Sequence, residues 1–150
     1  MTKKADFNAE EWSKVVEGPL LAGMRVITAD RGGTIRESMA MGQLYAQARQ
    51  QQGGSELLDE LVSSPPAMDP ARMRSVGDVG QASSEGLREA LRLLEQKASA
   101  EEVDAYRDFV RGVARAVARA HKEGGFLGVG GKEVSADEQA ALDEIEATLS

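Results

Sequence analysis

The sequence predicts an all-α fold, a single-domain bundle of six or seven helices with a glycine-rich loop before the last helix. The first observation is a repeated capping box, in which Asn, Ser or Thr precedes Glu by three positions. It occurs at Asn8 with Glu11, Thr34 with Glu37, Ser99 with Glu102 and Ser135 with Glu138. The second is the spacing of apolar residues by three and four, without the alternation that strands show. The third is an aromatic content of only 4%, which suits close-packed helices better than sheets.

Composition excludes several classes of function. The 150 residues are enough for one domain, which we place at residues 1–150. The chain has no cysteine, so disulfides, thiolate metal sites and cysteine nucleophiles are excluded. Its single histidine excludes the common multi-histidine metal sites, and we expect no cofactor. A net charge of −7 argues against general nucleic-acid binding, which needs a cationic surface.

The N-terminal region has no pattern typical of a targeting segment. Residues 1–7 carry no helical spacing, and we expect them to be disordered. Lys3 and Lys4 are not followed by the apolar run that a signal peptide would have. No stretch approaches the roughly 20 apolar residues of a membrane helix. We therefore expect a cytoplasmic protein without a membrane partner.

The first helical segment is expected to begin after Asn8 and to stop at Gly18-Pro19. Proline cannot continue a helix but can begin a new one. A second segment therefore follows, with Leu20, Met24 and Ile27 at helical spacing, and it ends at the Asp-Arg-Gly-Gly turn of residues 30–33. The next helix starts at Thr34, ends near Gly53-Gly54, and has a broad apolar face: Ile35, Met39, Met41, Leu44 and Tyr45. We interpret Trp12, Met24, Met39 and Met41 as core residues.

The middle of the chain is expected to be less regular. Ser55 can cap a short helix, which the prolines at 65 and 66 end: its apolar residues are Leu57, Leu58, Leu61 and Val62. Residues 63–83 are expected to form a long irregular connection with one helical turn at Asp69-Pro70. Ser84 is then expected to begin a helix whose apolar face is Leu87, Ala90, Leu91 and Leu94.

The strongest helical pattern runs from Ser99 to His121 or Lys122. Its apolar residues alternate spacings of three and four, which predicts a seam against another helix: Val103, Tyr106, Val110, Val113 and Val117. Because valine has only modest helix propensity, packing must hold this seam. The last helix is expected to begin at Ser135 and to pack through Leu142, Ile145 and Leu149.

The segment KEGGFLGVGGKEVS, residues 122–135, resembles a phosphate-binding loop only superficially. A Walker loop needs a further glycine where Phe126 stands and a hydroxyl where Glu133 stands. We interpret the segment as a structural hinge, in which glycines let the backbone turn and Phe126 plugs the core. Its structural residues are Gly124, Gly125, Phe126, Gly128, Gly130 and Gly131.

Two stretches carry a resemblance to a known group of proteins. EEWSKVVEGPLLAGMRVITAD near the start and AHKEGGFLGVGGKEVSADEQAALDEI near the end resemble a family of small bacterial helical proteins. The likeness covers roughly the first 35 and the last 45 residues, and it implies a helical fold but no catalytic residues. A looser similarity is to the TerB-like tellurite-resistance fold, whose turns resemble Asp-Gly-x-Ile-x-x-x-Glu. Residues 30–37 depart from that turn by Arg31 and an additional glycine.

Three groups of side chains are candidate sites. Asp30 and Glu37 could bind a divalent cation across their turn, although a helix cap with a solvated Asp30 is the favoured interpretation. Four arginines form a slanted ridge on the longest helix, which could receive an acidic partner or phosphate: Arg107, Arg111, Arg115 and Arg119. The favoured interpretation is that they are solvated or pair with carboxylates of the chain itself, such as those of the C-terminal helix. His121 lies at a helix end, with no nucleophile identifiable beside it.

These observations favour a non-enzymatic scaffold or protein-interaction module. Its expected partner is another protein or a second copy of the chain in a homodimer. The alternative is a binding module for a divalent cation or small anion, in line with a TerB-like, stress-associated role. A small enzyme is the third interpretation.

Overall fold

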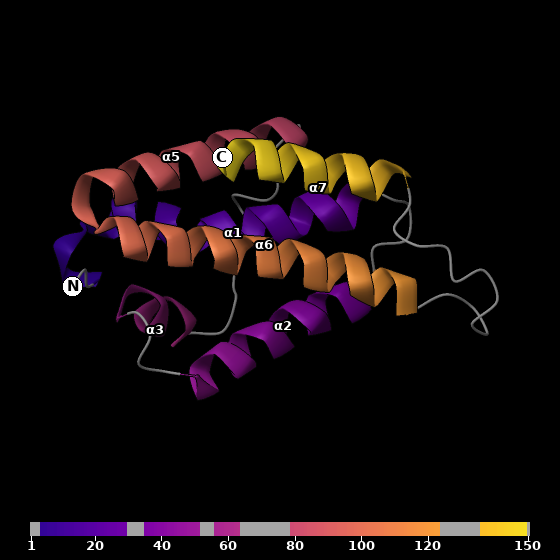
Figure 1. The fold of residues 1–150 in the computed structure, drawn as a ribbon, viewed down its shortest axis with the longest axis horizontal. Helices are drawn as coiled ribbons and strands as arrows, with labels where there is room; N and C mark the ends of the chain where they lie inside the picture. The colour runs from indigo at the N-terminus through magenta and orange to yellow at the C-terminus, as the bar shows by residue number, and fades with distance from the viewer. Residues whose placement is uncertain (1–3, 30–34, 52–55, 64–78, 124–135, 150) are drawn as a thin grey trace.

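The computed structural model describes residues 4–29, 35–51, 56–63, 79–123 and 136–149. In these residues the chain forms one short 3-10 turn and six α-helices, and no strand. The elements are η1 Lys4–Asp6, α1 Ala9–Ala29, α2 Ile35–Gln50, α3 Glu56–Val62, α5 Val79–Lys97, α6 Ala100–Glu123 and α7 Ala136–Leu149 (Figure 1). The all-α prediction is confirmed for this part of the chain. The predicted glycine-rich loop lies outside it.

Helices α1 and α6 are the centre of the bundle. α1 packs against α5, α6 and α7, and α6 packs against α2 on its other side (Figure 1). α3 lies against α2 and α6. The predicted seam of α6 is confirmed, because its members are at most 4% exposed: Val103, Tyr106, Val110, Val113 and Val117. Burying such side chains contributes about 1.5–3 kcal/mol each, which offsets the weak helix propensity of valine.

Two of the predicted capping boxes lie in the described residues, and both form. The Glu11 N–H donates to Asn8 Oδ1 over 2.8 Å, and the Asn8 N–H donates to Glu11 Oε1 over 3.0 Å. At the start of α6, the Glu102 N–H donates to the Ser99 hydroxyl over 3.2 Å. Each box satisfies backbone donors that the first helical turn leaves free. The boxes at Thr34 and Ser135 lie outside the described residues.

The predicted break at Gly18-Pro19 is wrong, because α1 continues through both residues. Proline at position 19 has no N–H, so the carbonyl of Val15 loses its helical donor. The hydroxyl of Tyr106, on α6, donates to that carbonyl over 2.8 Å. Glycine at position 18 makes room for it, since a Cβ there would collide with the Tyr106 hydroxyl. The helix is therefore completed by a donor from its neighbour.

The prediction that Ser84 begins a helix is also wrong. α5 begins at Val79, so Gly80 and Ser84 lie inside it. Gly80 is the second residue of α5, in the first turn, where a glycine interrupts a helix least, and α5 packs against α1 and α7. The Ser84 hydroxyl donates instead to Glu144 Oε1 of α7 over 2.9 Å, and the same carboxylate accepts from Arg25 of α1.

Residues 4–7 precede α1 and contact both α1 and α5. Lys4–Asp6 form a 3-10 turn, and Phe7 is buried. The Phe7 ring lies 5.7 Å from that of Trp12, and the Lys97 ammonium lies 5.4 Å from the Phe7 ring centroid. Aromatic and cation–π contacts of this kind stabilise the start of α1 against the end of α5.

Candidate functional site

The arginine ridge of α6 divides into two halves with different surroundings. A spacing of four residues advances each arginine about 40° around the helix axis. From Arg107 to Arg119 the direction of the side chains rotates by about 120° around the helix axis, so the two ends of the ridge face different neighbours. The first two arginines face α5 and α7, whereas the last two face the side on which α2 packs.

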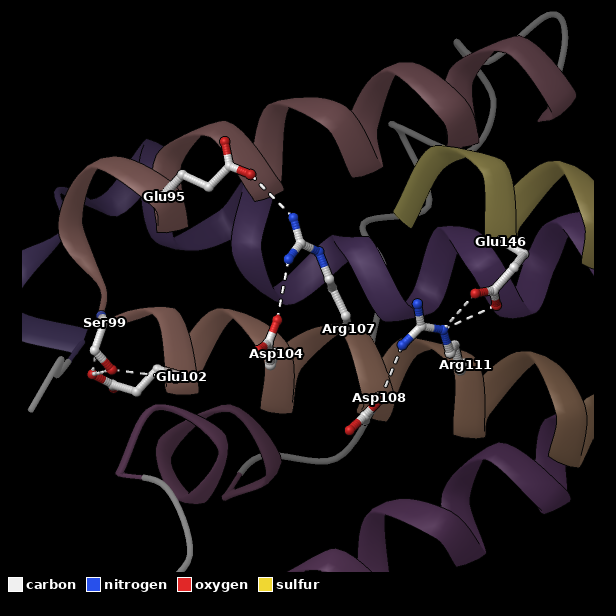
Figure 2. A network of polar contacts seen from close by, with 8 residues as sticks. All are labelled: Glu95, Ser99, Glu102, Asp104, Arg107, Asp108, Arg111 and Glu146. Atoms are coloured by element: carbon white, nitrogen blue, oxygen red, sulfur yellow. Dashed lines mark hydrogen bonds and ion pairs between the residues drawn. The ribbon is translucent and has the colours of Figure 1, made fainter. Parts of the chain in front are cut away.

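Arg107 and Arg111 belong to the internal contacts of the bundle (Figure 2). Arg107 donates to Glu95 of α5 over 3.1 Å and to Asp104 over 3.2 Å. Arg111 donates through Nε to both carboxylate oxygens of Glu146 on α7, each over 2.9 Å, and through Nη1 to Asp108. These carboxylates raise the pKa of Arg111. The structure thus shows a pairing with the C-terminal helix of the kind that the sequence favoured.

Arg115 and Arg119 have no such partners in the part of the chain that the structure describes. Both side chains are exposed, and no carboxylate in the described part of the chain lies within ion-pair distance of either. Both line a hollow of about 530 Å³ between α2 and α6. The remaining lining residues come from the facing sides of the two helices: Met39, Ala40, Gln43, Leu44, Gln47, Gly112, Ala116 and Ala120.

A second hollow continues the first toward α3. It has a volume of about 460 Å³ and shares Leu44, Gln47 and Gly112 with the first hollow. Phe109, Leu58 and Val62 give it a largely apolar lining. We call the two hollows together the α2–α6 groove. Its floor on α6 has small residues four positions apart, at Gly112, Ala116 and Ala120.

Met39 corrects the expectation that this methionine is a core residue. It is 58% exposed at the edge of the groove, whereas Met41 is buried. Trp12 is buried as expected. The sequence reasoning missed the groove itself. The groove has one signal in the sequence. Small residues stand at positions 112, 116 and 120, and arginines follow the first two of them by three residues, at positions 115 and 119.

The other predicted site residues are not placed. Asp30, the side chains of Glu37 and His121, and the glycine segment with Gly124, Gly125, Phe126, Gly128, Gly130 and Gly131 lie outside the described residues. Within the described ranges, no three His, Asp or Glu side chains come together as a metal site would require. The interpretations of these residues as a cation site and as a hinge stay predictions.

No protein-family model matches the chain, and neither a curated protein nor a solved structure shows significant similarity to it. None of the helices in the described ranges combines the length and apolar character needed to cross a bilayer. The geometry of the α2–α6 groove is therefore the basis for a functional proposal.

Proposed function

We propose that this protein is a non-enzymatic interaction module that binds a helix of another protein in the α2–α6 groove. The observation that carries the proposal is the exposed Met39 beside the hollow of about 530 Å³. Met39 is the one large hydrophobic side chain that is mainly exposed in the described part of the chain. Methionine is common at binding surfaces because its flexible, polarisable side chain adapts to a partner.

The neighbouring helix α3 supports a helical partner. α3 packs against α2 and α6 and buries Leu57, Leu61 and Val62, the apolar side of a short amphipathic helix. The first hollow lies farther along the same pair of helices. Small residues at Gly112, Ala116 and Ala120 would let a partner backbone approach closely. This corresponds to the recognition mode in which an amphipathic helix lies in an apolar groove.

The lining of the first hollow favours binding over catalysis. Its described residues are apolar, amide or guanidinium side chains, and none of them is a Ser, His, Asp or Glu. A nucleophile or general base is therefore missing from the described lining of the first hollow, whereas Asp59 and Asp108 line the second. The cytoplasmic location and the resemblance to small bacterial helical proteins, both expected from the sequence, are part of this proposal.

Site-specific photo-crosslinking in extracts of the source cells tests the proposal. A benzophenone amino acid at Gln43, which is exposed and lines the hollow, should give one discrete adduct. The same group at Gln50, an exposed residue of α2 outside both linings, is the matched control and should give none.

A groove-filling variant makes the crosslinking result specific. Ala116→Leu adds volume to the hollow without changing charge and should abolish the adduct at Gln43. Ala46→Leu, on the exposed side of α2, should leave it unchanged. Equal adducts at both crosslinking positions, or an adduct that persists in Ala116→Leu, would contradict the proposal.

Calorimetric titration separates the alternative of a cation- or anion-binding module. Calcium, magnesium, zinc and nucleotides are each added to the full chain. Micromolar binding that is lost in the double variant Asp30→Ala/Glu37→Ala would favour that alternative over the interaction module.

A further inference from the structure

We infer that the partner of the α2–α6 groove is an acidic amphipathic helix, with two carboxylates four residues apart that pair with Arg115 and Arg119. This inference rests on the proposed function and adds the chemistry of the partner. It follows from the charges at the edge of the first hollow, from the spacing of the two arginines, and from the apolar floor beside them. The second hollow of the groove is lined by Asp59 and Asp108, and Asp108 is paired with Arg111.

Among the residues that the structure describes, the two arginines have no ion pair, and they lie at the edge of a hollow. The other two members of the ridge are held by four carboxylates of the chain itself: Glu95, Asp104, Asp108 and Glu146. Arg115 and Arg119 have no ion pair among the described residues, although the chain carries 25 acidic residues against 18 basic ones. An exposed arginine pair beside a hollow whose floor includes Leu44 and Ala116 is complementary in charge to an acidic partner.

A second arginine pair shows what makes this one a candidate. Arg88 and Arg92 on α5 have the same spacing of four, are also exposed, and have no ion pair in the described ranges. Neither of them lines either hollow of the groove. Arg88 and Arg92 are thus ordinary solvated cations, and they provide a control of matched charge and spacing.

The geometry suits a helix with carboxylates at the same spacing. Four residues advance about 6 Å along a helix axis, so Arg115 and Arg119 present two guanidinium groups at about that repeat. Two carboxylates four residues apart on a partner helix repeat at the same interval. Each guanidinium can hold a carboxylate through two parallel hydrogen bonds, which fixes the register of the partner.

The apolar floor distinguishes a helix from a small anion. Leu44, Ala116 and Ala120 line the hollow beside the arginines. A phosphate ion would pair with the guanidinium groups but would leave this apolar surface in contact with water. A helix with an apolar stripe and an acidic edge covers both the floor and the cations, so it gains hydrophobic as well as electrostatic free energy.

Binding of synthetic peptides to the isotope-labelled full chain tests the inference. Three peptides of about 16 residues, roughly 24 Å when helical, share one Leu/Ala stripe. They carry two Glu, two Gln or two Lys residues, four positions apart, at the edge of that stripe. We expect the Glu peptide to shift the amide signals of residues 39–47 and 112–120. The Gln peptide should bind about five- to tenfold more weakly, and the Lys peptide more weakly still.

Paired variants locate the effect. Arg115→Gln/Arg119→Gln should remove the advantage of the Glu peptide over the Gln peptide, whereas Arg88→Gln/Arg92→Gln should leave it unchanged. Both pairs are exposed and without ion pairs in the described ranges, so both double variants should fold. Raising the salt concentration from about 0.05 to about 0.5 M should shrink the difference between peptides, because exposed charges are screened.

Failure of the inference is distinguishable from failure of the proposed function. If all three peptides bind the groove equally, the interaction module stands and the acidic partner is wrong. Groove shifts with inorganic phosphate alone, at the affinity of the Glu peptide, would overturn the inference in favour of a small-anion site. Self-association of the chain that Ala116→Leu abolishes would overturn it in favour of a second copy. If no peptide binds and Gln43 gives no crosslink, both the inference and the interaction module are wrong.

Discussion

The two tyrosines of the chain are both buried, but their hydroxyl groups differ in what they contact. The Tyr106 hydroxyl donates to the Val15 carbonyl, to which Pro19 cannot donate because proline has no backbone N–H. Tyr45 packs its ring edge-on against Phe109 at 5.1 Å, and its buried hydroxyl has no hydrogen-bond partner among the described residues. A buried polar group without a hydrogen-bond partner destabilises the fold. A buried hydroxyl that donates to a buried carbonyl stabilises it. The same hydroxyl group should therefore have opposite effects at the two positions.

Substitution of each tyrosine by phenylalanine tests this contrast. Tyr106→Phe should destabilise the fold by about 1–3 kcal/mol, because the Val15 carbonyl is left buried without a donor. Tyr45→Phe should be between neutral and about 1 kcal/mol more stable, since only an unpartnered hydroxyl is lost. Urea denaturation of both variants measures the two free energies of unfolding.

A further substitution assigns the cost of Tyr106→Phe to the Val15 carbonyl. Pro19→Ala restores a backbone N–H at position 19, so Tyr106→Phe should cost less in that background than in the original chain. An equal cost in both backgrounds would show that the hydroxyl acts in some other way.

At the scale of single elements, capping boxes were the most predictive feature of the sequence. Asn8 with Glu11 and Ser99 with Glu102 form as expected, because each box depends on side chains only three residues apart. The continuity of α1 through Pro19 could not be predicted locally, since it depends on a hydroxyl 91 residues away in sequence. The start of α5 at Val79 was also not predicted, because glycine disfavours a helix interior, whereas Gly80 lies in the first turn of α5.

The capping box of Asn8 and Glu11 at the start of α1 should make the free energy of unfolding depend on pH in the acid range. The Asn8 backbone N–H and the Lys97 ammonium, which lies 3.1 Å away, hold the pKa of Glu11 below its ordinary value. A carboxyl whose pKa is lower in the folded state contributes stability above its unfolded pKa, and this is lost as pH falls through the folded pKa. Glu11→Gln should therefore show a shallower loss of stability than the original chain as the pH falls below about 4.5.

Thermal melts between neutral pH and the acid range measure this slope. Glu10→Gln is the matched control, because Glu10 is an exposed neighbour in the same first turn. A slope that changes equally in both variants would contradict the assignment to the capping box.

At the scale of the whole molecule, the groove follows from how the helices are arranged. α2 and α3 pack on one side of α6, and α1, α5 and α7 pack on its other sides (Figure 1). Hollows remain on the α2 side of α6. The apolar spacing of α2 placed Met39 in the core together with Met41 and Tyr45, but periodicity cannot show where a neighbouring helix leaves a face uncovered. The division of the arginine ridge is partly visible in the sequence. Arg107 and Arg111 each have an aspartate three residues before them on α6, whereas Arg115 and Arg119 have Gly112 and Ala116 there. The carboxylates of α5 and α7 add to this difference.

Alkaline titration should report the bundle as one cooperative unit. The chain has two tyrosines and both are buried. Burial raises the pKa of Tyr45 and that of Tyr106 well above the ordinary value of 10, because a phenolate is disfavoured in an apolar interior. Above that value the unfolded chain releases protons that the folded chain retains, so stability falls as the pH rises beyond 10.

We therefore expect phenolate absorbance at 295 nm to appear together with the loss of helical circular dichroism, in one steep transition. The chain unfolded in urea is the control, and its tyrosines should titrate gradually near pH 10. Tyr45→Phe leaves Tyr106 as the only tyrosine, and its absorbance should still rise only with unfolding, because its hydroxyl lies between α1 and α6 at the centre of the bundle. Phenolate absorbance that develops while the helical signal is intact would show that these helices open locally, so that the interior is not one closed core.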